Sequence, residues 1–349
     1  MRTAVFSARP YDRRSLIEAN EQAGSPHDLD FLDGVGSLST TGPRLTARTA
    51  NLAADHEAVC AFTNDDLDRE TLTALAEVGC RSIALRCAGF NNLDLEAAGE
   101  LGFRIGRVPA YSPYAVAEHT IGLLLAVNRK IHRAHARVRE QNFALDGLLG
   151  SDLHGKTATV IGAGAIGSVL ARILLGFGCR VIAVDPNESD ELRSAGVEYL
   201  PLDRALPESS IVCLTCPLNE HTYHLINQKT IAMMPRGAFL INTARGAVID
   251  TTALIRALKD EHFAGVALDV YEEEQALFFE DRSTSILQDD EFARLLTFSN
   301  VLITSHQAFF TCEALSAIAS TTIENLTAID RDGAPPASNA IPGLQDASK

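Results

Sequence analysis

Three polar side chains that could bind a carboxylate and transfer a proton follow apolar runs in the second half of the chain. They are Arg245 after residues 238–241, Glu274 after 264–268 and His306 after 301–304. Arginine binds a carboxylate through two parallel hydrogen bonds, and histidine exchanges a proton near neutral pH. A nearby carboxylate can orient the imidazole and favour its protonated form. If the runs are strands of one parallel sheet, all three side chains face the crevice at its carboxyl edge, where hydride transfer would need them.

Each of these residues also has a structural interpretation. Arg245 could be paired with an acid at a surface helix end, and Glu274 closes an acidic run of the kind found in solvated loops. His306 is one of ten histidines, and a lone histidine is more often structural. Asp269 follows the run 264–268 and could merely end a strand, or it could hold the ribose or carboxamide of a nucleotide.

A glycine-rich turn at a strand-to-helix junction predicts a dinucleotide site. Residues 157–161 lead directly into Gly162-Ala163-Gly164-Ala165-Ile166-Gly167. The first glycine allows the tight turn, the second lets a pyrophosphate approach the backbone, and the third lets the helix pack on the sheet. Asp185 closes the next apolar run, where an acid accepts hydrogen bonds from the adenosine ribose. Because no arginine adjoins Asp185 to bind a 2′-phosphate, the pattern favours NAD over NADP.

Cysteine and histidine spacing gives little support for a metal site. Cys213 and Cys216 form C-x-x-C, but no second cysteine pair accompanies them, and Cys216 leads into Pro217. His132 and His135 lie among basic residues and are expected on a solvated helix face. We therefore predict no metal and no disulfide chemistry.

Alternating apolar runs and helical patterns divide the chain into two α/β series. The first has runs at 3–6, 28–32, 58–62 and 82–85, and the second at 158–161, 181–184, 211–214, 238–241, 264–268 and 301–304. Strands that alternate with helices predict parallel sheets covered on both faces, and six such strands are typical of the doubly wound dinucleotide fold. A long apolar helix is expected from Pro113, capped by Ser112 and buried between domains or subunits.

Composition argues against several classes of partner. The chain has 349 residues, with 45 acidic against 30 basic side chains and a formal net charge of −15. A nucleic-acid binder needs many lysines and arginines, and no apolar run is long enough to predict a membrane span. Seven scattered cysteines and the lack of an apolar leader favour a reducing compartment, so a cytoplasmic protein is expected.

The motifs resemble those of the D-isomer-specific 2-hydroxyacid dehydrogenases, and most closely those of the fermentative D-lactate dehydrogenases. The resemblance covers nearly the whole chain. Besides the glycine turn, it rests on Leu85–Asn92, Val108–Glu118, Cys216–Leu218, Asn242–Gly246, Leu268–Glu274 and Ile303–Phe310. For the D-lactate subgroup it rests on Phe278–Asp281 and His306–Phe310. One departure is Cys216, where many members of the family carry threonine or valine.

The resemblance implies roles for individual residues. The catalytic residues would be Arg245, Glu274 and His306. The substrate would contact Arg245, the aromatic side chains of Phe62, Tyr111 and Phe309, and the backbone N–H groups of Ala88 and Gly89. NAD would be surrounded by Gly162, Gly164, Ala165, Ile166, Gly167, Asp185, Cys216, Pro217, Thr222, Thr243, Ala244 and Asp269.

A domain arrangement and an activity are implied as well. Two doubly wound parallel-sheet domains are expected: a flavodoxin-like substrate domain of residues 1–108 with 306–334, and an inserted Rossmann NAD-binding domain of residues 109–305. Residues 335–349 would form a poorly ordered tail. The expected activity is reversible NADH-dependent reduction of pyruvate to D-lactate, in a homodimer or homotetramer. The alternatives are a dehydrogenase for larger 2-keto acids and an NAD-responsive, corepressor-like binding protein.

Overall fold

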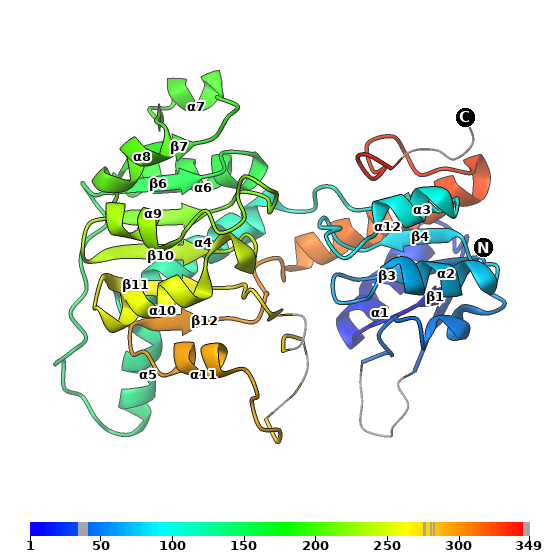
Figure 1. The fold of residues 1–349 in the computed structure, drawn as a ribbon, viewed down its shortest axis with the longest axis horizontal. Coiled ribbons are helices and arrows are strands. Elements are labelled where there is room, and N and C mark those ends of the chain that lie inside the picture. Colours follow the sequence, from blue (N-terminus) through cyan, green and yellow to red (C-terminus); the bar gives the residue numbers. More distant parts are fainter. Residues whose placement is uncertain (34–40, 275–276, 280, 282, 345–349) are drawn as a thin grey trace. The chain divides into compact units, whose positions relative to one another are not determined.

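The computed structural model describes residues 1–33, 41–274, 277–279, 281 and 283–344 (Figure 1). The chain forms two compact units, one of Met1–Ser112 with Phe310–Lys349 and one of Pro113–Phe309. The first unit therefore combines both ends of the chain, and the second is made from its middle. Of the Phe278–Asp281 segment quoted above, Glu280 lies outside the described residues.

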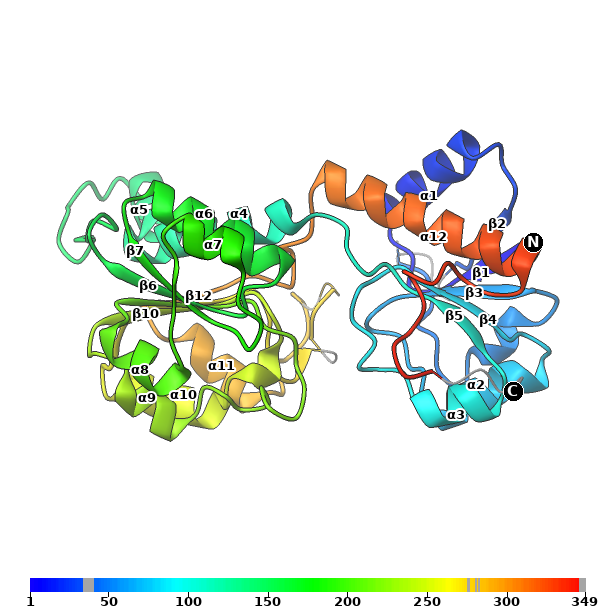
Figure 2. The same cartoon turned by 90° about the horizontal axis from the view of Figure 1, so that it is seen from above.

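A parallel sheet, five-stranded within the described residues, forms the centre of the first unit. Its strands are β1 Arg2–Val5, β2 Asp28–Phe31, β3 Ala58–Ala61, β4 Ser82–Leu85 and β5 Arg104–Gly106. Its helices are α1 Pro10–Gln22, α2 Arg69–Glu77, α3 Leu95–Glu100 and α12 Cys312–Asp332, with a short 3-10 helix at Ala50–Ala53. The strand order is β2-β1-β3-β4-β5, as in flavodoxin-like folds. Helices α1 and α12 cover one face, and α2 and α3 cover the other (Figure 2).

Buried strands and capped helices explain how this sequence forms the first unit. Every residue of β3 and β4 is buried, as expected for parallel strands covered on both faces. Asp68 accepts the backbone N–H of Thr71 and so caps the first turn of α2. On the opposite face, α12 contributes Ala319, Ile323 and Leu326 to the apolar core above the sheet.

The second unit is organised around a larger parallel sheet, with seven strands in the described part of the chain. The strands are β6 Thr157–Ile161, β7 Arg180–Val184, β8 Glu198–Tyr199, β9 Ile211–Leu214, β10 Ala238–Asn242, β11 Phe263–Leu268 and β12 Val301–Ile303. The helices are α4 Pro113–Asn128, α5 Ile131–Arg139, α6 Ala165–Gly176, α7 Asp190–Ser194, α8 Leu202–Ala205, α9 Gln228–Met233, α10 Thr251–Lys259 and α11 Asp290–Leu296. Helices α4 and α6 cover one face, and α9, α10 and α11 cover the other (Figure 2).

The strand order of the second sheet locates its ligand-binding edge. The strands lie in the order β12-β11-β10-β9-β6-β7-β8. The order reverses at β6, because the chain runs outward from β6 to β8 and then returns to pair β9 with β6 on the other side. In doubly wound sheets, ligands bind outside the carboxyl ends of the strands at such a reversal. The predicted fold class, two α/β units with parallel sheets, is confirmed.

Two predicted features differ in the structure. The prediction lacks β5 and β8, which have three and two residues and are too short for a periodic pattern. The long helix expected from Pro113 is divided into α4 and α5, because Lys130 takes a left-handed conformation with φ of 51°. Asn128 ends α4 by bonding both backbone groups of Ser151, at 2.7 and 2.9 Å.

Helix α4 is buried by its own unit. Its residues Ile121, Leu124 and Val127 belong to the apolar core shared with α6 and the sheet. This packing explains why α4 is apolar nearly all round. Among the described helices, none is long and apolar enough to cross a membrane.

Part of the expected tail packs on the first unit. Ala340 forms an antiparallel bridge to Gly106 at the edge of the sheet, and Arg107 donates its backbone N–H to the carbonyl of Asn339 at 2.9 Å. Ile341 is buried there. The segment covers β5, an edge strand that would otherwise present unpaired backbone groups. Residues 345–349 lie outside the described residues.

Candidate active site

Two glycines at the carboxyl end of β6 are required by the turn that follows it. Gly162 has φ of 92°, in the left-handed region that glycine adopts without strain. A Cβ on Gly162 would lie 2.5 Å from the backbone nitrogen of Cys216, and one on Gly167 would lie 1.9 Å from the carbonyl oxygen of Gly162. A larger residue at either position would therefore push the turn away from α6 or from the loop after β9.

The middle glycine of the motif faces open space. Gly164 is the N-cap of α6, and a Cβ built on it would meet no atom within 4 Å. The first amides of a helix have no partner within the helix, and its dipole favours an anion at that end. An open cradle at the amino end of this 12-residue helix suits a pyrophosphate. The residues of this turn therefore fit a dinucleotide.

Asp185, directly after β7, braces the same turn. Its Oδ2 accepts the backbone N–H of Ala163 at 2.7 Å, and its Oδ1 accepts that of Asn187 at 2.8 Å. Each carboxylate oxygen can accept two hydrogen bonds, so capacity remains for ribose hydroxyls. The residue predicted to bind the ribose thus lies beside the glycine turn. Its second role, holding that turn in shape, depends on tertiary contacts that the sequence pattern does not contain.

The loop after β9 supplies a buried thiol and a closed turn. Burial raises the pKa of the Cys216 thiol to about 11 and that of Cys213 to about 12, so both thiols are protonated near neutral pH. Thr222 donates its hydroxyl to the carbonyl of Pro217 at 2.6 Å, which closes the loop on itself.

Among the described residues, no three histidine, cysteine or acidic side chains cluster as a metal site would require.

His306 and Glu274 form a direct pair. His306 Nδ1 lies 2.8 Å from Glu274 Oε1, and Glu274 Oε2 accepts the backbone N–H of Tyr271 at 3.1 Å. A carboxylate can only accept, so the proton between them belongs to Nδ1, and Nε2 is the imidazole nitrogen left for chemistry. Phe279 lies beside the imidazole, with ring centroids 5.7 Å apart. Both members of the pair are partly exposed.

Asp269 holds the loop that carries His306. The buried carboxylate accepts the hydroxyl of Thr304 at 2.5 Å and the amides of residues 307–308 at 2.9 Å, and His119 Nε2 lies 3.4 Å away. Burial alone would raise the pKa of Asp269, but these hydrogen bonds outweigh it and lower that pKa. The backbone N–H of His306 also donates to the Asp269 carbonyl at 2.6 Å. His306 is thereby kept in a left-handed conformation with φ of 53°.

The contacts of Asp269 were only partly expected from the sequence. The sequence predicts Asp269 beside the nicotinamide and gives no role to Thr304 or His119. Thr304 directly follows β12, so its position after an apolar run could have drawn attention to it. His119 lies within α4 and is brought to Asp269 only by the packing of that helix on the sheet. No spacing rule connects residues so far apart in the chain.

Arg245 follows β10 in a turn that packs against the loop before Glu274. Its Nη1 donates to the carbonyl of Ala244 at 2.7 Å. Among the described residues, no carboxylate forms an ion pair with Arg245, so its charge is available to an anion. Gly246 allows the close packing, because a Cβ on it would lie 2.0 Å from the carbonyl carbon of Tyr271. The loops of Arg245, Glu274 and His306 therefore follow three adjacent strands, β10, β11 and β12.

The other predicted cofactor residues lie along the same edge. Thr243 and Ala244 follow β10, and the Thr243 hydroxyl lies 2.7 Å from that of Thr120 on α4. Ala165 and Ile166 form the first turn of α6. All of these residues belong to the second unit.

Four of the predicted substrate contacts belong to the first unit. Phe62 follows β3 directly, and Ala88 and Gly89 follow β4. The carbonyl of Ala88 accepts a hydrogen bond from Arg107 Nη1 at 3.0 Å. Within the described part of the chain, no acceptor takes the backbone N–H of Ala88 or Gly89. Tyr111 also lies in this unit, whereas Phe309 is buried at the end of the second.

Replacing Gly164 with alanine tests the cradle at α6. Because a Cβ there meets no protein atom, we expect Gly164→Ala to melt like the unmodified protein. The methyl group would occupy the space for the pyrophosphate, so the dissociation constant of NADH should rise at least about tenfold, or about 1.4 kcal/mol. Fluorescence titration with NADH measures this. Gly176→Ala, on the last turn of the same helix and also in open space, is the control; equal NADH affinity in both variants would contradict the assignment.

Comparisons with known proteins agree with this geometry. Residues 121–308 match the family model for the D-isomer specific 2-hydroxyacid dehydrogenase, NAD binding domain. The 2-hydroxyacid dehydrogenase homolog 1 of Schizosaccharomyces pombe is 49% identical over 328 residues, covering 94% of this chain and 96% of that protein. The D-lactate dehydrogenase of Escherichia coli is 48% identical over 331 residues, covering 95% of this chain and 97% of that protein.

Solved structures give the same result. The apo-structure of the Escherichia coli D-lactate dehydrogenase aligns with a TM-score of 0.85 at 45% identity, over 97% of this chain and 99% of that one. The D-lactate dehydrogenase of Aquifex aeolicus, complexed with NAD and lactic acid, aligns with a TM-score of 0.80 at 31% identity, over 95% and 96%. This chain therefore belongs to the D-isomer-specific 2-hydroxyacid dehydrogenase family and carries that family's NAD-binding domain.

Proposed function

We propose that this chain catalyses the reversible NADH-dependent reduction of pyruvate to D-lactate. The observation that carries the proposal is the 2.8 Å pair between His306 Nδ1 and Glu274 Oε1, with the guanidinium of Arg245 following the adjacent strand. These groups lie at the carboxyl edge of a sheet whose glycine turn fits a dinucleotide. The names of the relatives from Escherichia coli and Aquifex aeolicus support lactate as the substrate class.

Each of the three residues has a separate task in the proposed reaction. Arg245 binds the carboxylate of the keto acid through its planar guanidinium. His306 Nε2 donates a proton to the carbonyl oxygen as that oxygen gains negative charge. Glu274 holds the imidazole by Nδ1 and stabilises the protonated ring. The nicotinamide, when bound, supplies the hydride. In the oxidative direction, His306 takes the proton from the hydroxyl of lactate.

The proposed NAD site follows the carboxyl edge of the second sheet. The first turn of α6 receives the pyrophosphate, and Asp185 accepts the adenosine ribose hydroxyls and repels a 2′-phosphate. Cys216, Pro217, Thr243 and Ala244 contact the rest of the cofactor from the loops after β9 and β10. Thr222 shapes the first of these loops, and Asp269 acts at the nicotinamide end through the loop of His306. The family match to an NAD-binding domain supports this assignment.

We further propose that the substrate is a small 2-keto acid. Its proposed aromatic contacts are Phe62 and Tyr111 of the first unit and Phe309 of the second. Its carboxylate would be bound by the backbone N–H groups of Ala88 and Gly89 and by the guanidinium of Arg245. The domain roles follow: the first unit provides substrate contacts and the second binds NAD.

An exposed apolar segment supports a homo-oligomer, with a dimer as its smallest form. Helix α5 and the loop after it carry five large apolar side chains that are each more than half exposed: Ile131, Val138, Phe143, Leu145 and Leu149. Exposed apolar residues gathered in one segment mark a protein contact.

A cytoplasmic location is also proposed, supported by seven free cysteines, six of them buried.

Steady-state kinetics test the substrate assignment. We expect kcat/KM for pyruvate to exceed that for 2-ketoisocaproate and phenylpyruvate, because one added methylene already changes selectivity by about 1–3 kcal/mol in a closed apolar pocket. The product should be D-lactate, measured with a stereospecific lactate assay. Higher kcat/KM for the bulky acids would contradict the lactate assignment and favour a dehydrogenase for larger substrates.

A pair of adjacent glutamates tests the acid–base assignment. Glu274→Gln keeps the shape of the side chain but removes the charge that holds the protonated His306, so kcat for pyruvate reduction should fall roughly 100-fold. Glu273, one residue earlier, is exposed, and Glu273→Gln should retain kcat within about twofold. NADH binding should be the same in both variants. Equal kcat values for the two would remove Glu274 from the mechanism.

The apolar segment makes a prediction about assembly. The double variant Phe143→Ser/Leu145→Ser should dissociate at protein concentrations where the unmodified protein is oligomeric, because it removes two large apolar contacts worth about 1.5–3 kcal/mol each. Light scattering after size exclusion gives the mass. Ile286→Ser, which changes an equally exposed residue in another loop, should have no effect. A monomeric mass for the unmodified protein at micromolar concentration would contradict the proposed interface.

A further inference from the structure

One arginine in the first unit is buried next to the proposed substrate loop. Arg86 follows β4 and directly precedes Cys87, Ala88 and Gly89. It is 1% exposed and is among the largest fully buried side chains of the chain. Arginine is almost never buried without a partner, and replacing a buried ion pair with apolar residues often costs nothing. A purely structural explanation for a cation at this position is therefore weak.

The guanidinium of Arg86 connects three separate segments at the carboxyl edge of the first sheet. Its Nε lies 3.4 Å from Asp12 Oδ1 on α1, and its Nη1 donates to the carbonyl of Cys60, on β3, at 3.4 Å. Its Cζ lies over the ring of Phe62, 4.9 Å from the centroid. Burial would lower the pKa of Arg86, but Asp12 and the neighbouring groups outweigh it and raise that pKa, so the side chain is charged.

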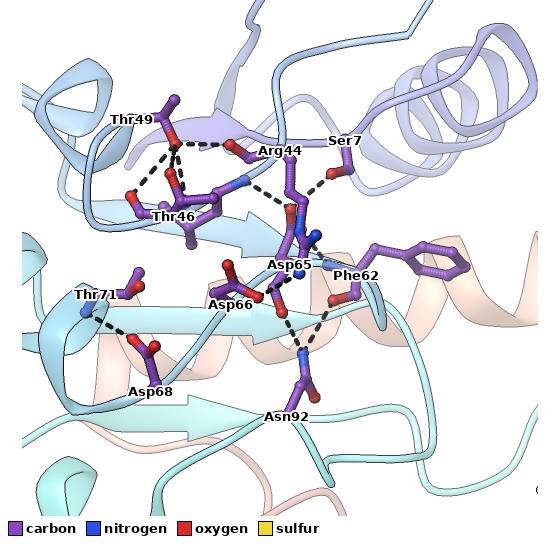
Figure 3. A network of polar contacts seen from close by, with 11 residues as sticks. Ser7, Arg44, Thr46, Thr49, Phe62, Asp65, Asp66, Asp68, Thr71 and Asn92 are labelled. Atoms are coloured by element: carbon purple, nitrogen blue, oxygen red, sulfur yellow. Dashed lines mark hydrogen bonds and ion pairs between the residues drawn. The ribbon is translucent and has the colours of Figure 1, made fainter. Parts of the chain in front are cut away.

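The backbone of Phe62 is held by polar contacts with Asp65 and Asn92 (Figure 3). Its N–H donates to Asp65 Oδ2 at 2.7 Å, and its carbonyl accepts from Asn92 Nδ2 at 3.3 Å. The same carboxylate accepts the hydroxyl of Ser7 at 2.6 Å and the amide of Leu45 at 2.8 Å. The polar network thus fixes where the backbone of Phe62 lies, and the guanidinium of Arg86 packs against its ring.

The loop after Arg86 is held through its carbonyls. Arg107 Nη1 donates to the carbonyl of Ala88 at 3.0 Å, and Cys87 Sγ donates to that of Gly89 at 3.2 Å. The backbone N–H groups of Ala88 and Gly89 have no acceptor within the described part of the chain. A loop whose carbonyls are occupied while its N–H groups remain available is prepared for an anion, and Arg86 is the anchor at its start.

We propose that Arg86 is a positioning residue for substrate binding. It sets the ring of Phe62 and the amides of Ala88 and Gly89 against each other, so that the carboxylate and the small side chain of a 2-keto acid are accommodated together. The proposal rests on the proposed function, because these residues are substrate contacts only if the chain reduces such an acid. Arg86 itself does not touch the substrate.

Conservative substitution separates this role from simple charge balance. Arg86→Lys keeps the buried charge but loses the planar fork that spans α1, β3 and Phe62. We expect the KM for pyruvate to rise at least about tenfold, while the KM for NADH stays within about twofold, because the NADH site belongs to the second unit. The ratio of kcat/KM for pyruvate over phenylpyruvate should fall. Asp12→Asn should shift both quantities in the same direction by a smaller amount.

An exposed arginine elsewhere in the same sheet is the control. Arg104 on β5 bonds the hydroxyl of Ser82 at 2.7 Å, at the amino end of the strands. Arg104→Lys should leave the pyruvate KM and the substrate ratio unchanged. Circular dichroism and melting temperature verify that each variant folds. If Arg86→Lys does not fold, the folded Asp12→Asn variant provides the same two measurements.

Three results would overturn the proposal. In the first, Arg86→Lys folds and keeps both the pyruvate KM and the substrate ratio. In the second, it lowers the melting temperature and reduces activity with all substrates equally, which would show a structural role only. In the third, the unmodified protein reduces no 2-keto acid, so that the proposed function fails and this inference fails with it. The first two leave the activity of the unmodified protein intact, so the two failures are distinguishable.

Discussion

The buried carboxylate of Asp269 is the interaction on which the arrangement of the active-site loops depends. Removing a charge from water is costly, and the cost is offset only where several donors converge on it. Here the donors are Thr304 and two amides of the turn after β12, with His119 of α4 nearby. That convergence fixes a backbone conformation in which His306 has a positive φ and meets Glu274. The pairing of His306 with Glu274 thus depends on a third charge, which contacts neither side chain of the pair.

The two units place their site residues in the same way. In both, a parallel sheet places side chains and loops at the carboxyl ends of neighbouring strands. These are the proposed acid–base groups in the second unit, and Phe62 with the loop after β4 in the first. The formal net charge of the chain is −15, and the proposed substrate and the cofactor are both anions. Groups close to the site must therefore attract these ligands. Attraction must come from Arg245, from the amino end of α6 and from backbone amides, at short range where solvent and salt screen least.

The sequence sufficed for those features that depend on strong local patterns. Long apolar runs placed Arg245, Glu274 and His306 at one edge, and the glycine spacing placed the turn after β6. The sequence did not suffice where tertiary contacts determine the local structure. β8 has two residues and no pattern. The long helix breaks where Lys130 takes a left-handed conformation and Asn128 bonds Ser151. A sequence also does not reveal which charges are buried, so the bracing contacts of Asp185 and Asp269 and the position of Arg86 emerged only from the fold.

The discontinuity of the first unit affects the order in which the protein is made. A ribosome releases Met1–Ser112 well before Cys312–Asp332, so the apolar face that α12 covers stays open while the middle of the chain emerges. Residues 113–309 contain every strand of their own sheet and need no later segment to complete it. Vectorial synthesis therefore favours completion of the inner unit first. A nascent chain stalled or cut before Cys312 would leave this apolar face uncovered.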